Sequence, residues 1–335
     1  MLCFVLHGKG DLRAEERPIP TPGPGEALIK IAGCGICHTD LAMIDGDWPF
    51  LPKLPKVIGH EYAGTVTRLG AGTTGVAVGD RVAVLQVRPC GLCPPCRRGT
   101  PWLCLSPRRL ESGGYAEYAA LPEQCLFRVP ANVSDEQAMT AEPFSVAVHS
   151  LDLAAFKPGE TAVVVGGGAI GLGIVALLRH AGAGKIVVSE PDPQRREVAS
   201  EFGADVALDP FACDLEQEVK ARTDGMGIDA AFEAVGSAKT FEACLALVRA
   251  EGTVVVAGVA KPAAQARINP FDVFARQLTI RGSYGTWRTL QRAIDLLPEV
   301  RPERVLTHCF PLRELPRAME LRRQQIGIKA YVVPE

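Results

Sequence analysis

Apolar residues in the middle of the chain alternate between strand-like and helix-like spacing. Residues 161–165 (TAVVV) form a short β-branched run, a glycine-rich turn follows, and residues 169–180 are apolar at helical spacing. A second β-branched run occupies residues 185–189. The pattern therefore predicts a strand, a tight turn, a helix and a second strand, which is one unit of a parallel sheet.

The same alternation of strands and helices continues to about residue 284. The predicted strands are 162–165, 185–189, 205–208, 229–233, 252–257 and 278–282. Strands that alternate with helices in this way fit a doubly wound parallel sheet of the Rossmann type. We expect this domain to span residues 143–284.

The first turn of this domain has the G-x-G-x-x-G spacing of dinucleotide-binding folds. We expect Gly166 to allow the sharp turn, Gly168 to let backbone amides approach a pyrophosphate, and Gly171 to let helix and strand pack closely. Glu190 lies nineteen residues after Gly171, where such folds place an acid that accepts from the adenosine ribose hydroxyls. Because its charge would repel a 2′-phosphate, NAD is expected rather than NADP. An ordinary glycine-rich βα turn is the alternative.

The two ends of the chain have a different pattern. Residues 1–142 contain short strand-like runs between turns rich in proline and glycine, such as PIPTPGPGE, and predict a β-rich domain. Its clearest predicted strands are 26–32, 64–69 and 80–85. The tail, residues 285–335, predicts helices at 290–297 and 315–323 and a strand at 329–333. We expect the tail to pack back on the first domain.

Composition and charge exclude several classes of partner. The length of 335 residues fits about two domains, and 47% hydrophobic residues can fill two cores. The net charge is −2, with 36 basic and 38 acidic residues and no long run of one sign, so neither nucleic acid nor a membrane surface is expected as a partner. The first apolar run is broken by His7 and followed by charges, which predicts no signal peptide or spanning helix and a cytoplasmic location.

Four of the eleven cysteines are closely spaced in a loop rich in proline and glycine. Cys90, Cys93, Cys96 and Cys104 form C-x2-C-x2-C-x7-C. Four thiolates at this spacing predict a closed tetrahedral zinc site, and because no ligand position is left open its role is structural. Two disulfides or reactive thiols are the alternatives, and both are less expected in a cytoplasmic protein.

A second set of metal-ligand residue types is scattered along the first domain. It comprises Cys37 in GCGICHTD, His60 and Glu61 in IGHEYAG, and Glu142 in AEPFSVAVH. Spacing alone does not bring these residues together. A single cysteine is more often a small buried hydrophobe, and a single histidine is more often a hydrogen-bonded polar residue.

Several motifs in order along the chain resemble those of the zinc-dependent medium-chain alcohol and polyol dehydrogenases. They are GCGICHTD, GHEYAGTV followed by VGDRV, the four-cysteine loop, and VVVGGGAIGLG. The resemblance covers nearly the whole chain. It implies a β-rich, GroES-like catalytic domain joined to the Rossmann domain, within an α/β protein.

The resemblance also implies a catalytic zinc site. Cys37 and His60 match zinc ligands of the family. Glu142 followed by Pro143 resembles the sorbitol, butanediol and threonine dehydrogenase branch, in which the acid of the GHE motif, here Glu61, is commonly a direct ligand. In that branch the later glutamate coordinates zinc or holds its water, so both glutamates are expected around the metal.

Four further positions match family residues. Thr39 matches the hydroxyl that passes the substrate proton outward, and Asp40 matches an acid that orients the histidine ligand. His38 matches a residue near the cofactor pyrophosphate and an end of the proton relay, and Lys329 matches a basic residue that reaches the pyrophosphate. From the residues alone, Thr39 could be a helix cap, Asp40 could accept local backbone amides, and Lys329 could be exposed to solvent.

Together the motifs predict an enzyme that reversibly oxidises a secondary alcohol or polyol to the ketone, with NAD and two zinc ions per chain, as a homodimer or homotetramer. CHTDLAMIDGDWP resembles the simple alcohol dehydrogenases instead, so a primary alcohol dehydrogenase is the alternative. A zinc-free quinone or enone reductase would lack Cys37, His60 and the cysteine loop. The alternative that is not an enzyme is an NAD-binding sensor or a structural protein.

Overall fold

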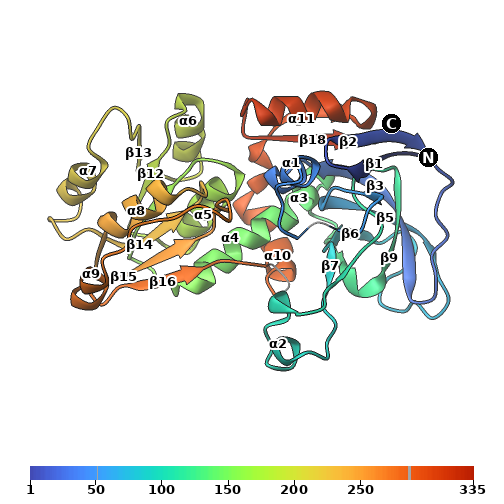
Figure 1. Ribbon diagram of the computed structural model, residues 1–335, viewed down its shortest axis with the longest axis horizontal. Helices are drawn as coiled ribbons and strands as arrows, with labels where there is room; N and C mark the ends of the chain where they lie inside the picture. The colour runs from blue at the N-terminus through green and yellow to red at the C-terminus, as the bar shows by residue number, and fades with distance from the viewer. Residues whose placement is uncertain (51, 286–287) are drawn as a thin grey trace. The chain divides into compact units, whose positions relative to one another are not determined.

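The chain forms two compact units. The computed structural model describes residues 1–50, 52–285 and 288–335. Residues 1–142 and the C-terminal segment 288–335 make the first unit, and Pro143–Gly285 make the second (Figure 1). In these described ranges no helix is long and apolar enough to cross a membrane.

The second unit is built on a six-stranded sheet with the order β13-β12-β11-β14-β15-β16, in which every described strand pair is parallel. Its strands are β11 (Thr161–Val165), β12 (Lys185–Ser189), β13 (Val206–Leu208), β14 (Ile228–Glu233), β15 (Val248–Val256) and β16 (Thr279–Gly282). Its helices are α5 (Ala169–His180), α6 (Pro193–Glu201), α7 (Leu215–Ala221), α8 (Ala238–Leu247) and α9 (Pro270–Ala275). Helix α4 (Ala141–Ala154) begins at the end of the first unit and continues into the second. This is the predicted doubly wound fold.

The β-branched runs form the core of this sheet. Val163, Val187 and Val254 are fully buried, as expected for parallel strands covered by helices. One strand differs from its prediction, since β15 begins at Val248 and not at residue 252. Arg249 and Glu251 interrupt the apolar pattern of its first residues, so the sequence gives no strand signal before residue 252. Glu251 also has a left-handed backbone, with φ of 61°.

The first unit is rich in antiparallel strands. Its main sheet has the order β10-β6-β5-β3-β18-β17, with β9 also paired to β3, and a second sheet has the order β2-β1-β4. The strands are β1 (Leu2–Gly8), β2 (Asp11–Glu16), β3 (Glu26–Gly35), β4 (Lys56–Val57), β5 (Glu61–Leu69), β6 (Arg81–Val84), β7 (Val87–Arg88), β8 (Arg108–Arg109), β9 (Tyr118–Pro122), β10 (Leu126–Arg128), β17 (Leu306–Pro311) and β18 (Lys329–Val333). The C-terminal strand β18 lies beside β3.

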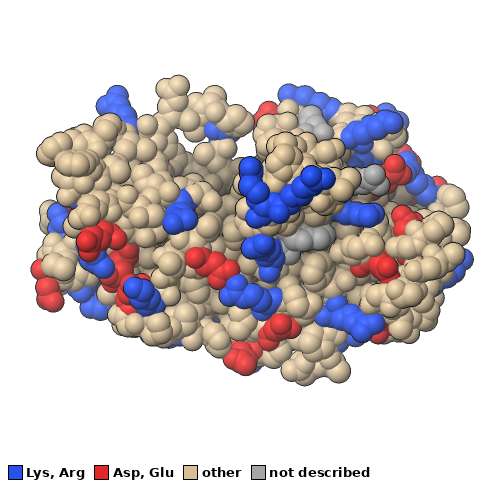
Figure 2. Space-filling model, turned by 90° about the horizontal axis from the view of Figure 1, so that it is seen from below, with Lys and Arg blue, Asp and Glu red and all other residues tan. Residues whose placement is uncertain are grey.

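Short helices complete the first unit. They are α1 (His38–Ile44), α2 (Pro94–Arg97), α3 (Asp135–Met139), α10 (Leu290–Val300) and α11 (Leu315–Arg323), with 3₁₀ turns at Pro101–Leu103, Glu123–Cys125, Pro302–Val305 and Leu312–Glu314. The core of this unit includes Ile29, Ile36, Tyr62 and Tyr115, all almost fully buried. On the face in Figure 2, basic and acidic side chains both occur, which agrees with the net charge of −2.

Candidate metal and cofactor sites

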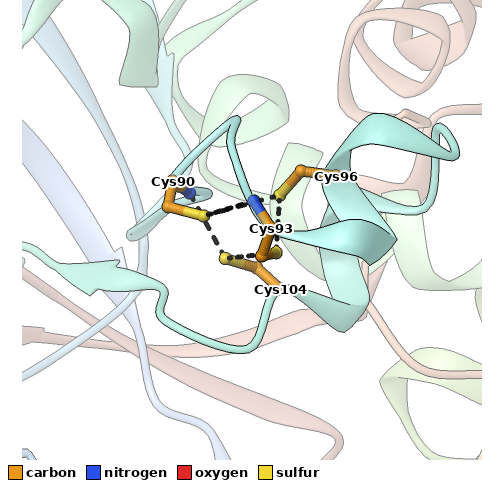
Figure 3. A group of neighbouring side chains, drawn as sticks. All are labelled: Cys90, Cys93, Cys96 and Cys104. Atoms are coloured by element: carbon orange, nitrogen blue, oxygen red, sulfur yellow. Dashed lines mark hydrogen bonds between the residues drawn. The ribbon is translucent and has the colours of Figure 1, made fainter.

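The four cysteines of the loop converge on one point (Figure 3). The Sγ–Sγ distances are 4.0 Å for Cys90 and Cys96, 3.5 Å for Cys93 and Cys96, and 3.8 Å for Cys93 and Cys104. A tetrahedron of thiolates around zinc, with Zn–S bonds of about 2.3 Å, has edges of about 3.8 Å. The separations are far too long for disulfides, and all four thiols are free. The donor set therefore fits a closed zinc site.

Backbone amides support this thiol cluster. The N–H of Cys93 donates to Cys90 Sγ at 3.3 Å, and the N–H of Cys90 donates to Cys104 Sγ at 3.3 Å. Hydrogen bonds from the backbone of Cys96 and Leu105 lower the pKa of Cys93 to about 6, whereas desolvation and the Cys93 thiol raise the pKa of Cys96 to about 12. Because zinc binds the thiolate form of cysteine, metal binding has to release the protons that these thiols still carry.

A second cluster joins residues from two neighbouring strands. Cys37 is the N-cap of α1, two residues after the end of β3, and Glu61 begins β5, where it pairs in register with Gly35. His60 immediately precedes β5. One ligand atom from each of Cys37, His60 and Glu61 lies within 4.8 Å of the other two. The antiparallel pairing of β3 with β5 thus assembles three of the four residues that sequence spacing alone could not join.

Asp40 connects two of these residues. Its fully buried carboxylate lies 3.1 Å from His60 Nδ1 through Oδ1, and Oδ2 accepts from the Cys37 N–H at 3.0 Å. Oδ2 also accepts from the Tyr115 hydroxyl at 2.7 Å. Burial opposes ionisation of Asp40, but the charge of His60 and these hydrogen bonds together lower its pKa. The structure therefore places Asp40 where it can orient His60, as the resemblance implies.

Lys329 is buried against Glu61. Its Nζ donates to Glu61 Oε1 at 2.7 Å and lies 2.5 Å from Oε2. Apart from this ion pair with Lys329, Oε2 has no hydrogen-bond partner among the described residues, so it has room for a metal as a further partner. A Cβ at Gly35 would lie 2.4 Å from Oε2, so a larger residue there would displace this carboxylate. The expected contact of Lys329 with a pyrophosphate stays a prediction beside this observed ion pair.

Glu142, in the first turn of α4, is outside the group of converging ligand atoms. Burial raises its pKa to about 7, the charge of His60 lowers it, and the charge of Glu61 raises it further. Glu142 therefore lies within electrostatic range of the cluster, and its coordination of zinc stays a prediction.

The two predicted relay residues lie on α1. The Thr39 N–H is 3.5 Å from Cys37 Sγ, which places Thr39 beside the metal cluster. His38 is exposed, and desolvation by neighbouring atoms together with the charges of Arg322 and Arg323 lowers its pKa. A neutral imidazole at position 38 can both accept and donate a proton.

The three fingerprint glycines have distinct geometries in the second unit. Gly166 has φ of 108°, and a Cβ there would lie 2.8 Å from the Val235 side chain. A Cβ at Gly171 would lie 1.9 Å from the Gly166 carbonyl oxygen, whereas Gly168, the N-cap of α5, has open space beside it. Turn, close packing and open approach are the three properties that a dinucleotide site requires. The residues therefore fit the cofactor.

Glu190 lies beside the same turn. It is buried, its Oε2 accepts from the Gly167 N–H at 2.6 Å, and its Oε1 accepts from the Asp192 N–H at 3.0 Å. This carboxylate supports the glycine turn, a role that the sequence did not indicate. Arg196 donates to the backbone carbonyls of Glu190 and Pro191 and lies 3.6 Å from Asp209.

Tyr115 and the Lys329–Glu61 pair were missed by sequence reasoning. Tyr115 belongs to no ligand-like motif, and an aromatic residue in an apolar stretch resembles an ordinary core residue. The basic character of Lys329 was noticed, but its partner was not. No local signal identifies either contact, because each joins residues that are far apart in the chain.

Comparison with known proteins agrees with this geometry. Residues 23–131 match the family described as "Alcohol dehydrogenase GroES-like domain", and residues 169–299 match "Zinc-binding dehydrogenase". L-threonine 3-dehydrogenase of Pyrococcus horikoshii is 35% identical over 305 residues, which cover 88% of this chain and 87% of that protein. Sorbitol dehydrogenase of Gallus gallus is 32% identical over 343 residues, covering 98% and 95%.

The fold is also similar to solved structures. A protein of Sinorhizobium meliloti 1021, assigned as a zinc-binding dehydrogenase and bound to NADP, superposes with a TM-score of 0.94 at 32% identity, covering 99% of each chain. The matches of both units to family models and the similarity to these relatives indicate the same family. The chain therefore belongs to the zinc-dependent medium-chain alcohol and polyol dehydrogenases, oxidoreductases that act on CH–OH groups.

Proposed function

We propose that the protein catalyses reversible, zinc-dependent and NAD-linked oxidation of a secondary alcohol or polyol to the ketone. The observation that carries the proposal is the convergence of Cys37, His60 and Glu61, separate from the closed set of four cysteines. Thiolate, imidazole and carboxylate are zinc donors, and three protein ligands leave a fourth position for substrate. Two zinc ions per chain, one catalytic and one structural, are therefore proposed.

The residues around the cluster have complementary roles in this proposal. When bound, zinc supplies a Lewis acid for the alcohol oxygen, and NAD supplies the hydride acceptor. Asp40 holds His60 through Nδ1, which leaves Nε2 as the ligand atom. The Thr39 hydroxyl takes the alcohol proton and passes it outward, with His38 as the acceptor at the surface. The position of Thr39 next to Cys37 supports this role.

The two glutamates are proposed to share the metal environment. Glu61 is the proposed direct ligand, because one of its carboxylate oxygens converges with the ligand atoms of Cys37 and His60, and zinc would share this carboxylate with Lys329. Glu142 is proposed to hold water at the metal or to replace Glu61 as substrate enters. The effect of the charges of His60 and Glu61 on the pKa of Glu142 supports its proximity.

A secondary alcohol or polyol is the proposed substrate class. The two relatives described above are named for L-threonine 3-oxidation and sorbitol oxidation, and both reactions oxidise a CH–OH group. A carboxylate ligand in place of a second thiolate makes the cluster more polar, which suits substrates with vicinal hydroxyls. The alternative, a primary alcohol, rests on the segment CHTDLAMIDGDWP; its Trp48 forms an edge-to-face pair with the exposed Phe50, which directly follows the segment.

NAD is the proposed cofactor, held by the Gly166–Gly171 turn, Glu190 and Lys329. Glu190 supports this choice because its carboxylate borders the turn, where a 2′-phosphate would meet its charge. Arg196, which could neutralise a phosphate, is already bonded to backbone carbonyls. The Sinorhizobium neighbour binds NADP, so the two cofactors have to be compared directly.

A homodimer or homotetramer in the cytoplasm is proposed. Strand β16 is an edge of the six-stranded sheet, and Phe271 and Phe274 of the neighbouring α9 are 71% and 78% exposed. An open strand edge beside exposed aromatic residues fits association with a second copy. All eleven cysteines are free, which fits a compartment that keeps thiols reduced.

A substrate panel tests the proposal. Turnover of vicinal diols, polyols, L-threonine and primary alcohols should be measured with NAD and with NADP, on protein whose zinc content is known. The proposal expects the highest kcat/KM for a secondary alcohol with NAD. Preference for a primary alcohol would favour the alternative enzyme, and NAD binding without turnover of any alcohol would favour a sensor or structural role.

A further inference from the structure

We propose that Tyr115 is a positioning residue for the catalytic metal cluster, an inference that rests on the proposed function. The side chain is completely buried, and its hydroxyl donates to Asp40 Oδ2 at 2.7 Å. The carbonyl oxygen of Gly35, at 3.3 Å, is a more distant second acceptor. Tyr115 is outside the converging group of ligand atoms, so it acts through Asp40.

Asp40 transmits the position of Tyr115 to two proposed zinc ligands. One carboxylate oxygen faces the ring of His60, and the other accepts from the backbone N–H of Cys37. A rotation of this carboxylate would therefore move both contacts together. The Tyr115 hydroxyl is the third partner, and it opposes that rotation. Without it, the Cys37 amide would be the remaining partner of Oδ2 among the described residues, inside a fully buried site.

The backbone of Tyr115 is held by hydrogen bonds on both sides. The Phe4 N–H donates to the Tyr115 carbonyl at 2.9 Å, and the Tyr115 N–H donates to the Ile58 carbonyl at 3.0 Å. The aromatic ring packs on the turn that leads to His60, because a Cβ at Gly59 would lie 3.0 Å from the ring. Rigid support of this kind is what a positioning residue needs.

Burial also keeps the hydroxyl in its donor form. Desolvation, followed by the charge of Asp40, raises the pKa of Tyr115 well above its usual value. The phenol thus stays protonated across the working range of pH, and the contact with Asp40 is a constant constraint.

The test compares Tyr115→Phe with Tyr62→Phe. Tyr62 is an equally buried tyrosine of the same core, and its hydroxyl donates to Gln86 Oε1 at 2.7 Å, away from Asp40. Each variant loses one buried hydroxyl and keeps the ring. The dissociation constant of the catalytic zinc should be measured by chelator competition, with the absorption spectrum of the cobalt(II)-loaded site as a second readout.

Loss of a partner behind a metal ligand weakens metal binding or activity by about 10–100-fold. We expect about a 10-fold weaker catalytic zinc site and an altered cobalt spectrum in Tyr115→Phe, with a larger loss in kcat than change in the KM for NAD. Zinc in the four-cysteine loop should remain, which shows that the variant is folded. Tyr62→Phe should keep the affinity and spectrum of the unmodified protein.

Equal zinc affinities and spectra in the two variants would overturn the role of Tyr115. If the unmodified protein bound only the zinc of the cysteine loop, the proposed function would fail first, and the inference would fail with it. A double-mutant cycle gives an independent reading: in an Asp40→Asn background, Tyr115→Phe should cause little further loss of zinc affinity. Full additivity of the two losses would contradict the inference.

Discussion

The ammonium of Lys329 lies 2.7 Å from Glu61 Oε1, and both side chains are buried. The two residues are 268 positions apart and meet because β3 pairs with β5 on one side and β18 on the other. Burial by itself lowers the pKa of Lys329, but the charges of Glu61 and Cys37 and the hydrogen bond to Glu61 together outweigh it, so the pKa is raised and the ammonium stays charged. Since Glu61 also belongs to the converging group of ligand atoms, a zinc ion bound there would compete with Lys329 for one carboxylate.

This competition predicts opposite effects of Lys329→Met on metal binding and on stability. Removing one partner of a buried ion pair costs about 3–5 kcal/mol, so the zinc-free variant should unfold at a lower denaturant concentration. The freed carboxylate should in turn release catalytic zinc to a chelator more slowly. Lys329→Arg keeps the charge and serves as the control. Zinc release and unfolding unchanged in Lys329→Met would show that the two groups do not compete.

Glu190→Gln separates the charge of this residue from its support of the glycine turn. A glutamine oxygen can still accept from the Gly167 N–H, although the Asp192 N–H loses its acceptor, so the turn should be kept with a small loss of stability. The KM for NAD should rise and the exclusion of NADP should weaken, because the repelling charge is lost. Initial rates with each cofactor measure this. If the unmodified enzyme already uses both cofactors equally, Glu190 does not select NAD.

The two glutamates of the metal environment should differ in their effects. Glu61→Gln weakens a direct ligand, so both zinc retention and turnover should fall. Glu142→Gln should lower turnover, with the smaller effect on zinc retention, because Glu142 is outside the converging group. Zinc analysis and kcat of the two variants give the comparison. Near-normal values in both would place the two carboxylates outside the catalytic cluster.

Asp229 predicts a pH-dependent contribution to stability. Oδ2 accepts from the backbone and hydroxyl of Thr161 at 2.7 Å each, and Oδ1 pairs with Arg249. Burial raises the pKa, but these hydrogen bonds outweigh it and the net pKa is lowered. A lowered pKa stabilises the native state above the unfolded pKa, near 3.8, and the stabilisation is lost as pH falls through the native value.

The free energy of unfolding of Asp229→Asn should therefore be lower by about 1–3 kcal/mol at neutral pH, because partly buried donors lose a charged acceptor. The difference in free energy of unfolding between the variant and the unmodified protein should become smaller as pH falls below about 4. Asp224→Asn, at an exposed position, is the control for the change in charge. Denaturant unfolding across this range measures the effect, and a gap that widened on acidification would contradict it.

Local features of the protein could be predicted from its sequence. The glycine turn, the sheet strands and the four cysteines depend on spacings within a few dozen residues, and the structure has them there, apart from the earlier start of β15. The contacts of Asp40 with Tyr115 and of Glu61 with Lys329 could not be predicted, since they join residues 75 and 268 positions apart. The second contact depends on the register of β3 with β5 and β18, and the first depends on the backbone bonds of Tyr115 to Phe4 and Ile58; no short motif encodes either.

Cys37, His60 and Glu61 are proposed to hold the catalytic zinc, and the four cysteines are proposed to hold a structural one. The most direct test is zinc content per chain, measured together with NAD-dependent turnover, in His60→Ala and Cys93→Ser. His60→Ala should keep one zinc and a folded protein but lose turnover, whereas Cys93→Ser should lose the loop zinc and lower the melting temperature. Two zinc ions and undiminished turnover in His60→Ala would contradict the assignment.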